Sequence, residues 1–95
     1  MLEIRIEKSF KKDIQRDKKS GNYSAKDFNL LKKIVDNLLN GQPIDKRFKR
    51  HILSGNMQSY EIIHVKNDWL LVFKIDRHYL NLVMIGKHPH VYKKF

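Results

Sequence analysis

The sequence predicts a small α+β domain in which two helices pack on one face of a mostly antiparallel sheet. Three observations support this prediction. The chain starts with a segment in which apolar and charged residues alternate. A later segment carries apolar residues at helical spacing, and three short apolar-rich segments with brief turns between them follow it. With 95 residues, 41% of them hydrophobic, the chain is expected to form one domain over residues 1–95 around a modest core. The expected order of elements is β-α-α-β-β-β.

The start of the chain is expected to form a strand and a basic helix. Apolar residues at positions 2, 4 and 6 alternate with charged ones, which predicts a strand over residues 1–6. Ser9 is a candidate N-cap for a helix that runs to about Lys19. Gly21-Asn22 then interrupts the helical pattern.

The second helix has the clearest signals in the sequence. Ser24 is a candidate N-cap, and Asp27 three residues later comes close to a capping-box pattern. Asn40-Gly41 ends the helix, and Pro43 follows. Its apolar stripe is most simply core, with a partner-docking face as the less favoured alternative. The stripe consists of Phe28, Leu31, Ile34, Val35, Leu38 and Leu39.

The second half of the chain is expected to be a β-meander. A basic loop over residues 46–51 and a turn at Ser54-Gly55-Asn56 precede it. Three strands are predicted, at Gln58–Val65, Trp69–Ile75 and Tyr79–Ile85. The segments between them are short enough for two successive antiparallel hairpins.

The chain is strongly basic, with 20 lysines and arginines against 10 aspartates and glutamates, a formal net charge of +10. Such a charge on a small body attracts anions. Nucleic acid ranks first among the expected partners, because no long segment combines a strong apolar face with a basic face in the way of a membrane-surface helix.

Several classes of protein are excluded or disfavoured. The absence of cysteine excludes disulfides, thiol catalysis and cysteine-ligated zinc. The charged N-terminus does not resemble a signal peptide, and the longest apolar run, Trp69–Phe73, is too short to span a bilayer. A cytoplasmic protein without a membrane partner is therefore expected.

Histidines among lysines in the second half indicate a candidate active site. In a meander the third strand runs parallel to the first, so their C-terminal ends meet at one edge. This topology places His64, Asp68 and His88 together, with His51 at the end of the basic loop. Such groups can cleave RNA without a metal: a base activates the ribose 2′-hydroxyl, an acid protonates the leaving 5′-oxygen, and cations stabilise the charged phosphorane.

Simpler interpretations remain open for the same residues. His64 and Asp68 can pair merely to stabilise a hairpin, and Trp69 can be ordinary core instead of stacking on an unpaired base. His78 is expected to be a solvated turn residue, while His51 and His90 are undecided. The spacing of the histidines matches no zinc signature.

Three segments in order resemble the YafQ-type toxins of the RelE superfamily, which come from bacterial type II toxin–antitoxin systems. They are Phe48-Lys49-Arg50-His51-Ile52-Leu53-Ser54-Gly55, the His64–Trp69 block followed by Leu70-Leu71-Val72-Phe73, and the closing Gly86-Lys87-His88. The resemblance covers nearly the whole chain. Each segment alone is weak evidence for the family, but the three in this order and at these separations are a fairly specific signature.

The resemblance implies a RelE-like, microbial ribonuclease-type fold and an mRNA interferase. Such an enzyme is a metal-independent and cofactor-free endoribonuclease that enters the vacant ribosomal A site and cuts the codon there. His51, His64, Asp68 and His88 match the family's catalytic residues. The resemblance also implies an acidic antitoxin partner, and binding to operator DNA only as the toxin–antitoxin pair. The residues expected to bind RNA are Lys49, Arg50, Lys66, Trp69, Lys87 and Tyr92.

The chain departs from the family pattern at three positions. Glu61 and Met84 stand where relatives often have arginine, and Asn67 where proline is frequent. Losing two arginines removes cations that can stabilise the transition state, and a lysine matches a phosphate less well. These departures are therefore expected to affect substrate preference and catalytic rate.

Two other functions are compatible with the fold and charge. One is a non-enzymatic toxin of the gyrase-poisoning ParE kind, which has no need of the histidines. The other is a plain RNA- or ribosome-binding module, which the charge alone would support.

Overall fold

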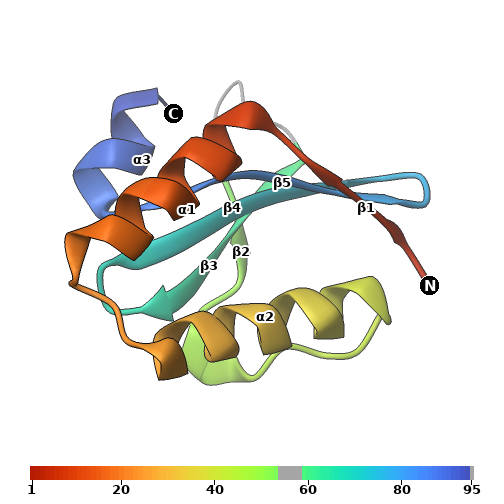
Figure 1. Cartoon of the computed structure of the whole chain (residues 1–95). Helices are drawn as coiled ribbons and strands as arrows, with labels where there is room; N and C mark the ends of the chain where they lie inside the picture. The colour runs from red at the N-terminus through yellow and green to blue at the C-terminus, as the bar shows by residue number, and fades with distance from the viewer. Residues whose placement is uncertain (54–58, 95) are drawn as a thin grey trace.

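The computed structural model describes residues 1–53 and 59–94, which form five strands and four helical segments (Figure 1). The predicted turn at Ser54-Gly55-Asn56 and the predicted first residue of the next strand, Gln58, lie outside the described residues. The elements in order are β1 Glu3–Ile6, α1 Lys8–Ser20, α2 Ala25–Leu39, η1 Lys46–Phe48, β2 His51–Ile52, β3 Tyr60–Lys66, β4 Trp69–Asp76, β5 Tyr79–Gly86 and α3 His88–Lys94.

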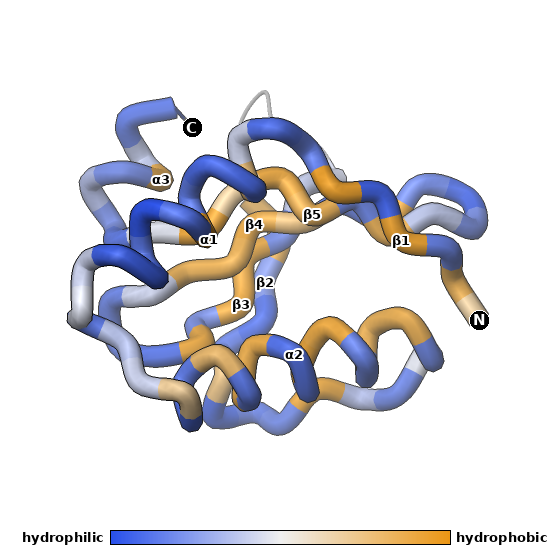
Figure 2. The backbone as a smooth tube through the Cα atoms, viewed as in Figure 1, coloured by the Kyte–Doolittle hydropathy of each residue, from blue (hydrophilic) through white to orange (hydrophobic). Residues whose placement is uncertain are grey.

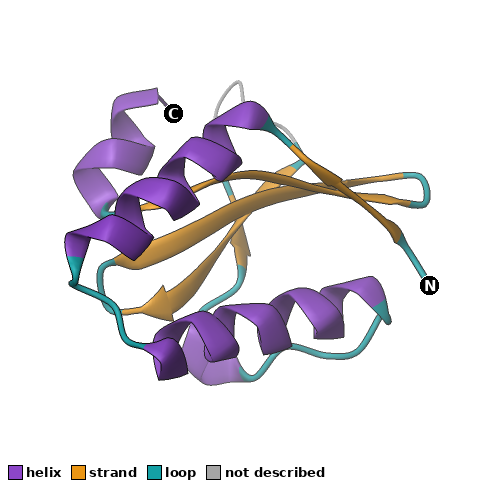
Figure 3. Ribbon diagram, viewed as in Figure 1, coloured by secondary structure: helices purple, strands orange, loops and turns teal. Residues whose placement is uncertain are grey.

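The strands form a single sheet in the order β1-β5-β4-β3-β2 (Figure 3). Strand β1 pairs with β5 in parallel, and the other three pairings are antiparallel. The predicted α+β fold with a mostly antiparallel sheet is confirmed. The two predicted hairpins are also present, so the C-terminal ends of β3 and β5 lie at the same end of the sheet.

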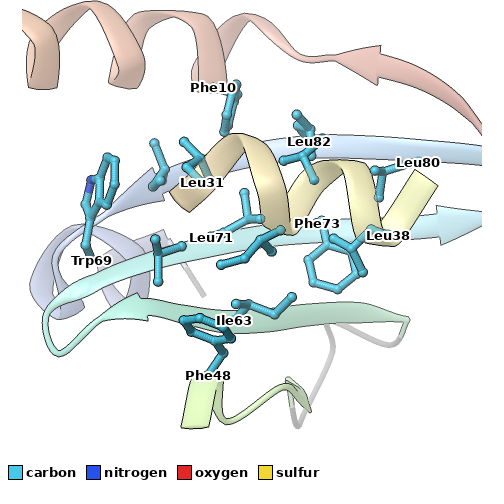
Figure 4. Close-up of a cluster of buried hydrophobic side chains, with 14 residues drawn as sticks. Phe10, Leu31, Leu38, Phe48, Ile63, Trp69, Leu71, Phe73, Leu80 and Leu82 are labelled. Atoms are coloured by element: carbon cyan, nitrogen blue, oxygen red, sulfur yellow. The ribbon is translucent and has the colours of Figure 1, made fainter. Parts of the chain in front are cut away.

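Helices α1 and α2 cover one face of the sheet, as predicted. Phe10 of α1 and the stripe of α2 pack against strand residues such as Leu71 and Phe73 (Figure 4). The hydropathy pattern in Figure 2 shows the same division, with hydrophobic strands in the centre and hydrophilic stretches on the outer parts of α1. The stripe of α2 is therefore core.

The capping box of α2 is formed as its sequence predicted. The Ser24 hydroxyl accepts a hydrogen bond from the Asp27 backbone N–H at 3.3 Å, and the Asp27 carboxylate accepts one from the Ser24 N–H at 2.9 Å. These contacts satisfy two donors that the first helical turn leaves free.

The opposite face of the sheet is covered in part by α3, a helix that the sequence analysis did not predict. Ile62, Leu70 and Val72 form a second buried cluster there, and Val91 of α3 packs against it. Because Val91 is the only buried residue of α3, the sequence of this helix shows no apolar stripe at helical spacing. Pro89 does not prevent the helix, because it lies in the first turn, where its missing N–H has no partner to lose.

Two further expectations are corrected by the structure. Ser9 does not cap α1, because the helix begins at Lys8, and the Ser9 hydroxyl instead donates to the Val83 carbonyl of β5. The basic loop over residues 46–51 contains η1 and the first residue of β2, which pairs with β3 at the sheet edge.

Within the described ranges 1–53 and 59–94, none of the helices has the length and apolar character needed to cross a membrane.

Candidate active site

Asp68 and His88 form a hydrogen-bonded pair at the end of the sheet where β3 turns into β4. One oxygen of Asp68 accepts from the His88 ring Nδ1 at 2.6 Å and from the His88 backbone N–H at 2.8 Å. These two hydrogen bonds hold the pKa of Asp68 below its usual value, so the carboxylate is charged. Because a carboxylate can only accept, Nδ1 carries a proton, and Nε2 is left as the nitrogen that gains and loses one.

His64 lies between two other histidines on the face of the sheet that carries α3. Its ring centroid is 5.6 Å from that of His88 and 5.6 Å from that of His51. Partial burial, followed by the charges of His51, His88 and Lys49, lowers the pKa of His64. A neutral imidazole is therefore favoured at this position near neutral pH, as a general base requires.

His51 is exposed on β2, next to His64. Its Nδ1 is 2.8 Å from the Lys49 carbonyl oxygen, which makes Nδ1 the donor and leaves Nε2 free. The predicted meeting of His64, Asp68 and His88 at one end of the sheet is therefore present in the structure, and His51 lies beside His64.

A cleft of about 470 Å³ opens beside these groups. His64 and His88 line one part of it, while Leu30 and Phe48 contribute apolar surface from α2 and η1. Three cations also line the cleft: Arg47, Lys49 and Lys66. A cleft with titratable groups, apolar walls and cations is suited to a nucleotide whose phosphate lies near the histidines.

Two of the expected RNA-binding cations already have acidic partners. Arg50 donates to both oxygens of Glu61, at 2.7 and 3.3 Å, and Lys66 lies 3.2 Å from Asp27. Glu61, which stands where relatives often have arginine, thus holds a neighbouring arginine. Met84, at the other such position, is only 3% exposed and belongs to the second buried cluster.

The expectation that Trp69 stacks on an RNA base is wrong for this conformation, because the residue is 0% exposed. Its indole N–H donates to the buried carboxylate of Asp17 at 2.8 Å, and its ring stacks on Tyr23 at a centroid distance of 4.2 Å. Tyr92 remains available for stacking: it is 46% exposed and lies 5.9 Å from the His88 ring.

The structure departs from one of the simpler interpretations of these residues, the pairing of His64 with Asp68, and agrees with another, the exposed His78. Asp68 pairs with His88 and not with His64. His90 lies 3.1 Å from Asp13 of α1, and His78 is exposed in the β4–β5 turn beside Tyr79. In the described part of the chain, no three or more His, Asp and Glu side chains form a group that could hold a metal ion.

Sequence reasoning missed two features of the site. Arg47 was expected only as part of a basic loop, but η1 turns it toward the cleft. Asp13 and Asp17 occupy the charged-looking helix α1 and are nonetheless buried, since they accept hydrogen bonds from β5 and Trp69. Their spacing of four residues on one helix face was the only available signal.

Comparison with known proteins relates the chain to one family. A family model described as the bacterial toxin of type II toxin–antitoxin system, YafQ, matches residues 2–93. The mRNA interferase toxin YafQ of Escherichia coli K12 is 33% identical over 90 residues, which cover 83% of this chain and 98% of that protein.

Two solved structures resemble the fold over nearly its full length. One is the Escherichia coli DinJ–YafQ complex, with a TM-score of 0.85, 27% identity, and coverage of 97% of this chain and 99% of the matched chain. The other is a metal-bound toxin from Helicobacter pylori, with a TM-score of 0.85, 36% identity, and coverage of 96% and 99%.

Proposed function

The chain belongs to the YafQ family of bacterial toxins from type II toxin–antitoxin systems, and from this premise we propose that it is a ribosome-dependent mRNA interferase. The observation that supports this proposal most directly is the Asp68–His88 pair facing His64 at the mouth of a basic cleft. The Escherichia coli relative is named an mRNA interferase toxin, which agrees with the same chemistry.

The proposed reaction is an attack by the ribose 2′-hydroxyl on the neighbouring phosphorus. His64 accepts the hydroxyl proton, the 2′-oxygen bonds to phosphorus, and the bond to the 5′-oxygen breaks. His88 gives the proton from Nε2 to that oxygen. The products are a 2′,3′-cyclic phosphate and a 5′-hydroxyl. Two imidazoles with centroids 5.6 Å apart can both reach one phosphodiester.

The remaining site residues support these two histidines. Asp68 fixes the ring of His88 and stabilises its protonated form, as the aspartate of a catalytic triad does. Lys49 supplies positive charge for the phosphorane, and partial burial together with the proximity of His51 keeps His64 neutral. Tyr92 can stack on a base beside the cut, while Lys66 and Arg50 bind the backbone after exchanging their acidic partners for phosphate.

The proposed mechanism requires no metal, because proton transfer and cationic side chains complete each step. Cleavage is accordingly expected to persist in the presence of a chelator that binds transition metals and leaves the ribosome's Mg²⁺ in place. Loss of cleavage on chelation, restored by a metal, would transfer the catalytic role to an ion.

The proposed partners follow from the family and from the charge. The mRNA is presented in the ribosomal A site, in the cytoplasm. An acidic antitoxin is expected to neutralise the toxin by covering the basic cleft with an initially flexible segment, and operator DNA is bound only by the pair. The structure of a DinJ–YafQ complex supports such a partner for this chain.

Primer extension tests the proposal directly. An mRNA is incubated with the protein, with and without translating ribosomes. In-frame cuts only with ribosomes are the expected result, and cuts on naked RNA would indicate a free ribonuclease. Intact mRNA in both conditions would refute the enzymatic proposal. DNA-damage signalling on expression would then favour the ParE-like function, and salt-sensitive binding would favour a binding module.

Variants connect the cuts to the site. His64→Ala and His88→Ala are each expected to reduce cleavage about 10²- to 10⁴-fold, the usual contribution of an acid or a base. His78→Ala, at the exposed β4–β5 turn, is the matched control and should cleave like the unmodified protein.

A further inference from the structure

Two more clefts continue from the proposed catalytic cleft around the β3–β4 turn. A cleft of about 380 Å³ shares Lys66 and Asn67 with it, and a third cleft of about 390 Å³ shares Asn22, Tyr23 and Lys87 with the second. We call the second and third clefts together the turn groove. Figure 1 shows the α1–α2 connection, the β3–β4 turn and α3 at the same end of the sheet. The turn groove is thus a continuation of the catalytic cleft.

The charges available in the turn groove are positive. Lys66 and Lys87 are both exposed and both line its first part; Lys66, which lies 3.2 Å from Asp27, would exchange that partner for a phosphate. The two carboxylates along it already have partners: Asp68 accepts from His88, and Asp17 accepts from Trp69 and Arg16. A polyanion leaving the catalytic cleft therefore meets cations and amide groups there, while both carboxylates are already engaged in hydrogen bonds.

The turn groove also contains one aromatic platform. Tyr23 lines both of its parts and is partly exposed. Its ring stacks on the buried ring of Trp69 at an interplanar angle of 18°, and Phe28 meets it edge-on at 6.4 Å. Because the Asp17 hydrogen bond fixes Trp69, Tyr23 is the outermost ring of a rigid stack. Such a ring is suited to a nucleobase, and stacking on it requires no particular base.

We propose that a nucleotide flanking the cut lies in the turn groove, with its base against Tyr23 and its phosphate between Lys66 and Lys87. The inference rests on the proposed function and extends it, since it gives the RNA a path beyond the scissile bond. A single-stranded RNA fits better than an acidic peptide, because a peptide carboxylate uses the lysines but gains nothing from the aromatic platform.

Fluorescent RNA tests the inference. The probe is a 2′-O-methyl RNA heptamer, which the proposed mechanism cannot cut, with 2-aminopurine placed at each position in turn. Stacking quenches 2-aminopurine, so one position is expected to be quenched on binding to the unmodified protein. Tyr23→Phe keeps the ring and the quenching. Tyr23→Ala is expected to lose the quenching at that position and to weaken binding about 5- to 100-fold.

The matched control is Tyr79→Ala. Tyr79 is also a partly exposed tyrosine, but it begins β5 and lies under Arg5, 3.5 Å from the guanidinium carbon. This variant should quench and bind like the unmodified protein. Absence of any position-specific quenching, or quenching that survives in Tyr23→Ala, would overturn the inference. So would a Tyr23→Ala protein that binds RNA normally but binds an acidic peptide less well.

A second variant keeps the inference testable if Tyr23→Ala fails to fold. Lys87→Met retains the aliphatic stem and is expected to reduce the slope of log affinity against log salt by about 0.7, as the loss of one phosphate contact on a single strand does. An unchanged slope would remove Lys87 from the RNA path and contradict the proposal. Primer extension on ribosomes tests the proposed function separately, so either can fail while the other holds.

Discussion

At the scale of single residues, the site depends on how Asp68 orients His88. The carboxylate accepts from both the ring and the backbone N–H of the same residue, so the ring cannot rotate without losing a hydrogen bond. This fixes one tautomer and directs Nε2 away from the carboxylate. The same contact stabilises the charge on a protonated ring, which an acid catalyst carries before it gives up its proton.

Asp68→Asn tests this orienting role. An amide can still accept from the backbone N–H, but it carries no charge to stabilise the imidazolium and can favour the wrong tautomer. We expect cleavage to fall about 10²- to 10⁴-fold with little change in KM, measured on ribosomal complexes. Asp76→Asn, which changes an exposed carboxylate at the end of β4, is the control. Equal losses in both variants would mean that the effect is one of charge alone.

The pH dependence should report His64. Burial and neighbouring cations lower its pKa below the ordinary histidine value, so the free base persists to more acidic pH. If His64 is the base, kcat/KM falls as pH decreases through that lowered pKa, and the midpoint lies below about 6.5. His51→Ala removes a neighbouring charge and should shift the midpoint upward. A midpoint that stays fixed in His51→Ala but moves in His78→Ala would exclude His64 as the general base.

Trp69 shows what residue-level reasoning could not decide. An aromatic at the start of a strand beside a turn is compatible with either core or base stacking. The choice depends on Asp17, which lies 52 positions earlier in the chain and accepts the indole N–H. Nothing local to Trp69 reveals that partner. Tyr23 likewise carries no local signal of its place in the structure, because Trp69, on which its ring stacks, is distant in the chain.

At the scale of elements, a polar cluster around the buried carboxylate of Asp13 fixes α3 against α1. Asp13 accepts from the Ile85 backbone N–H at 3.0 Å, from Arg16 at 3.0 Å and from His90 at 3.1 Å. Helix α3 also packs closely against the end of β5, since a Cβ on Gly86 would lie 2.5 Å from the His90 ring. His88 is the first residue of α3, so the position of this helix decides where the proposed acid lies.

Asp13→Ala should therefore reduce both stability and cleavage. It leaves the buried Ile85 N–H without a partner and removes one carboxylate from Arg16, which costs about 2–4 kcal/mol of unfolding free energy. Urea denaturation measures this loss, and Asp36→Ala on the exposed side of α2 is the control. An Asp13→Ala protein as stable as the control would show that the cluster does not hold α3.

The sequence predicted elements well where a signal is local and repeated. The stripe and capping box of α2 and the two short turns were sufficient to place three strands, and the topology alone brought His64, Asp68 and His88 to one edge. Helix α3 was missed because its only buried residue is Val91. It is held by Asp13 and the second cluster, both of which are distant in the chain.

At the scale of the whole molecule, internal ion pairs leave the basic character of the surface in place. Asp13 and Asp17 share Arg16, and Glu61 holds Arg50, so these carboxylates serve the fold and do not mask the surface. The excess of ten positive charges consequently faces outward. A field of this size accelerates the encounter with a polyanion more than it affects the chemical step.

Salt should therefore separate encounter from chemistry. Raising KCl from about 50 to 200 mM at constant Mg²⁺ screens the long-range attraction to the ribosome, because the Debye length falls. We expect kcat/KM for ribosomal cleavage to decrease at least about 10-fold, while kcat at saturating substrate stays nearly constant. Sucrose at the same osmolality controls for general solution effects. A kcat that falls with salt while kcat/KM is constant would place the charge in the catalytic step and not in the approach.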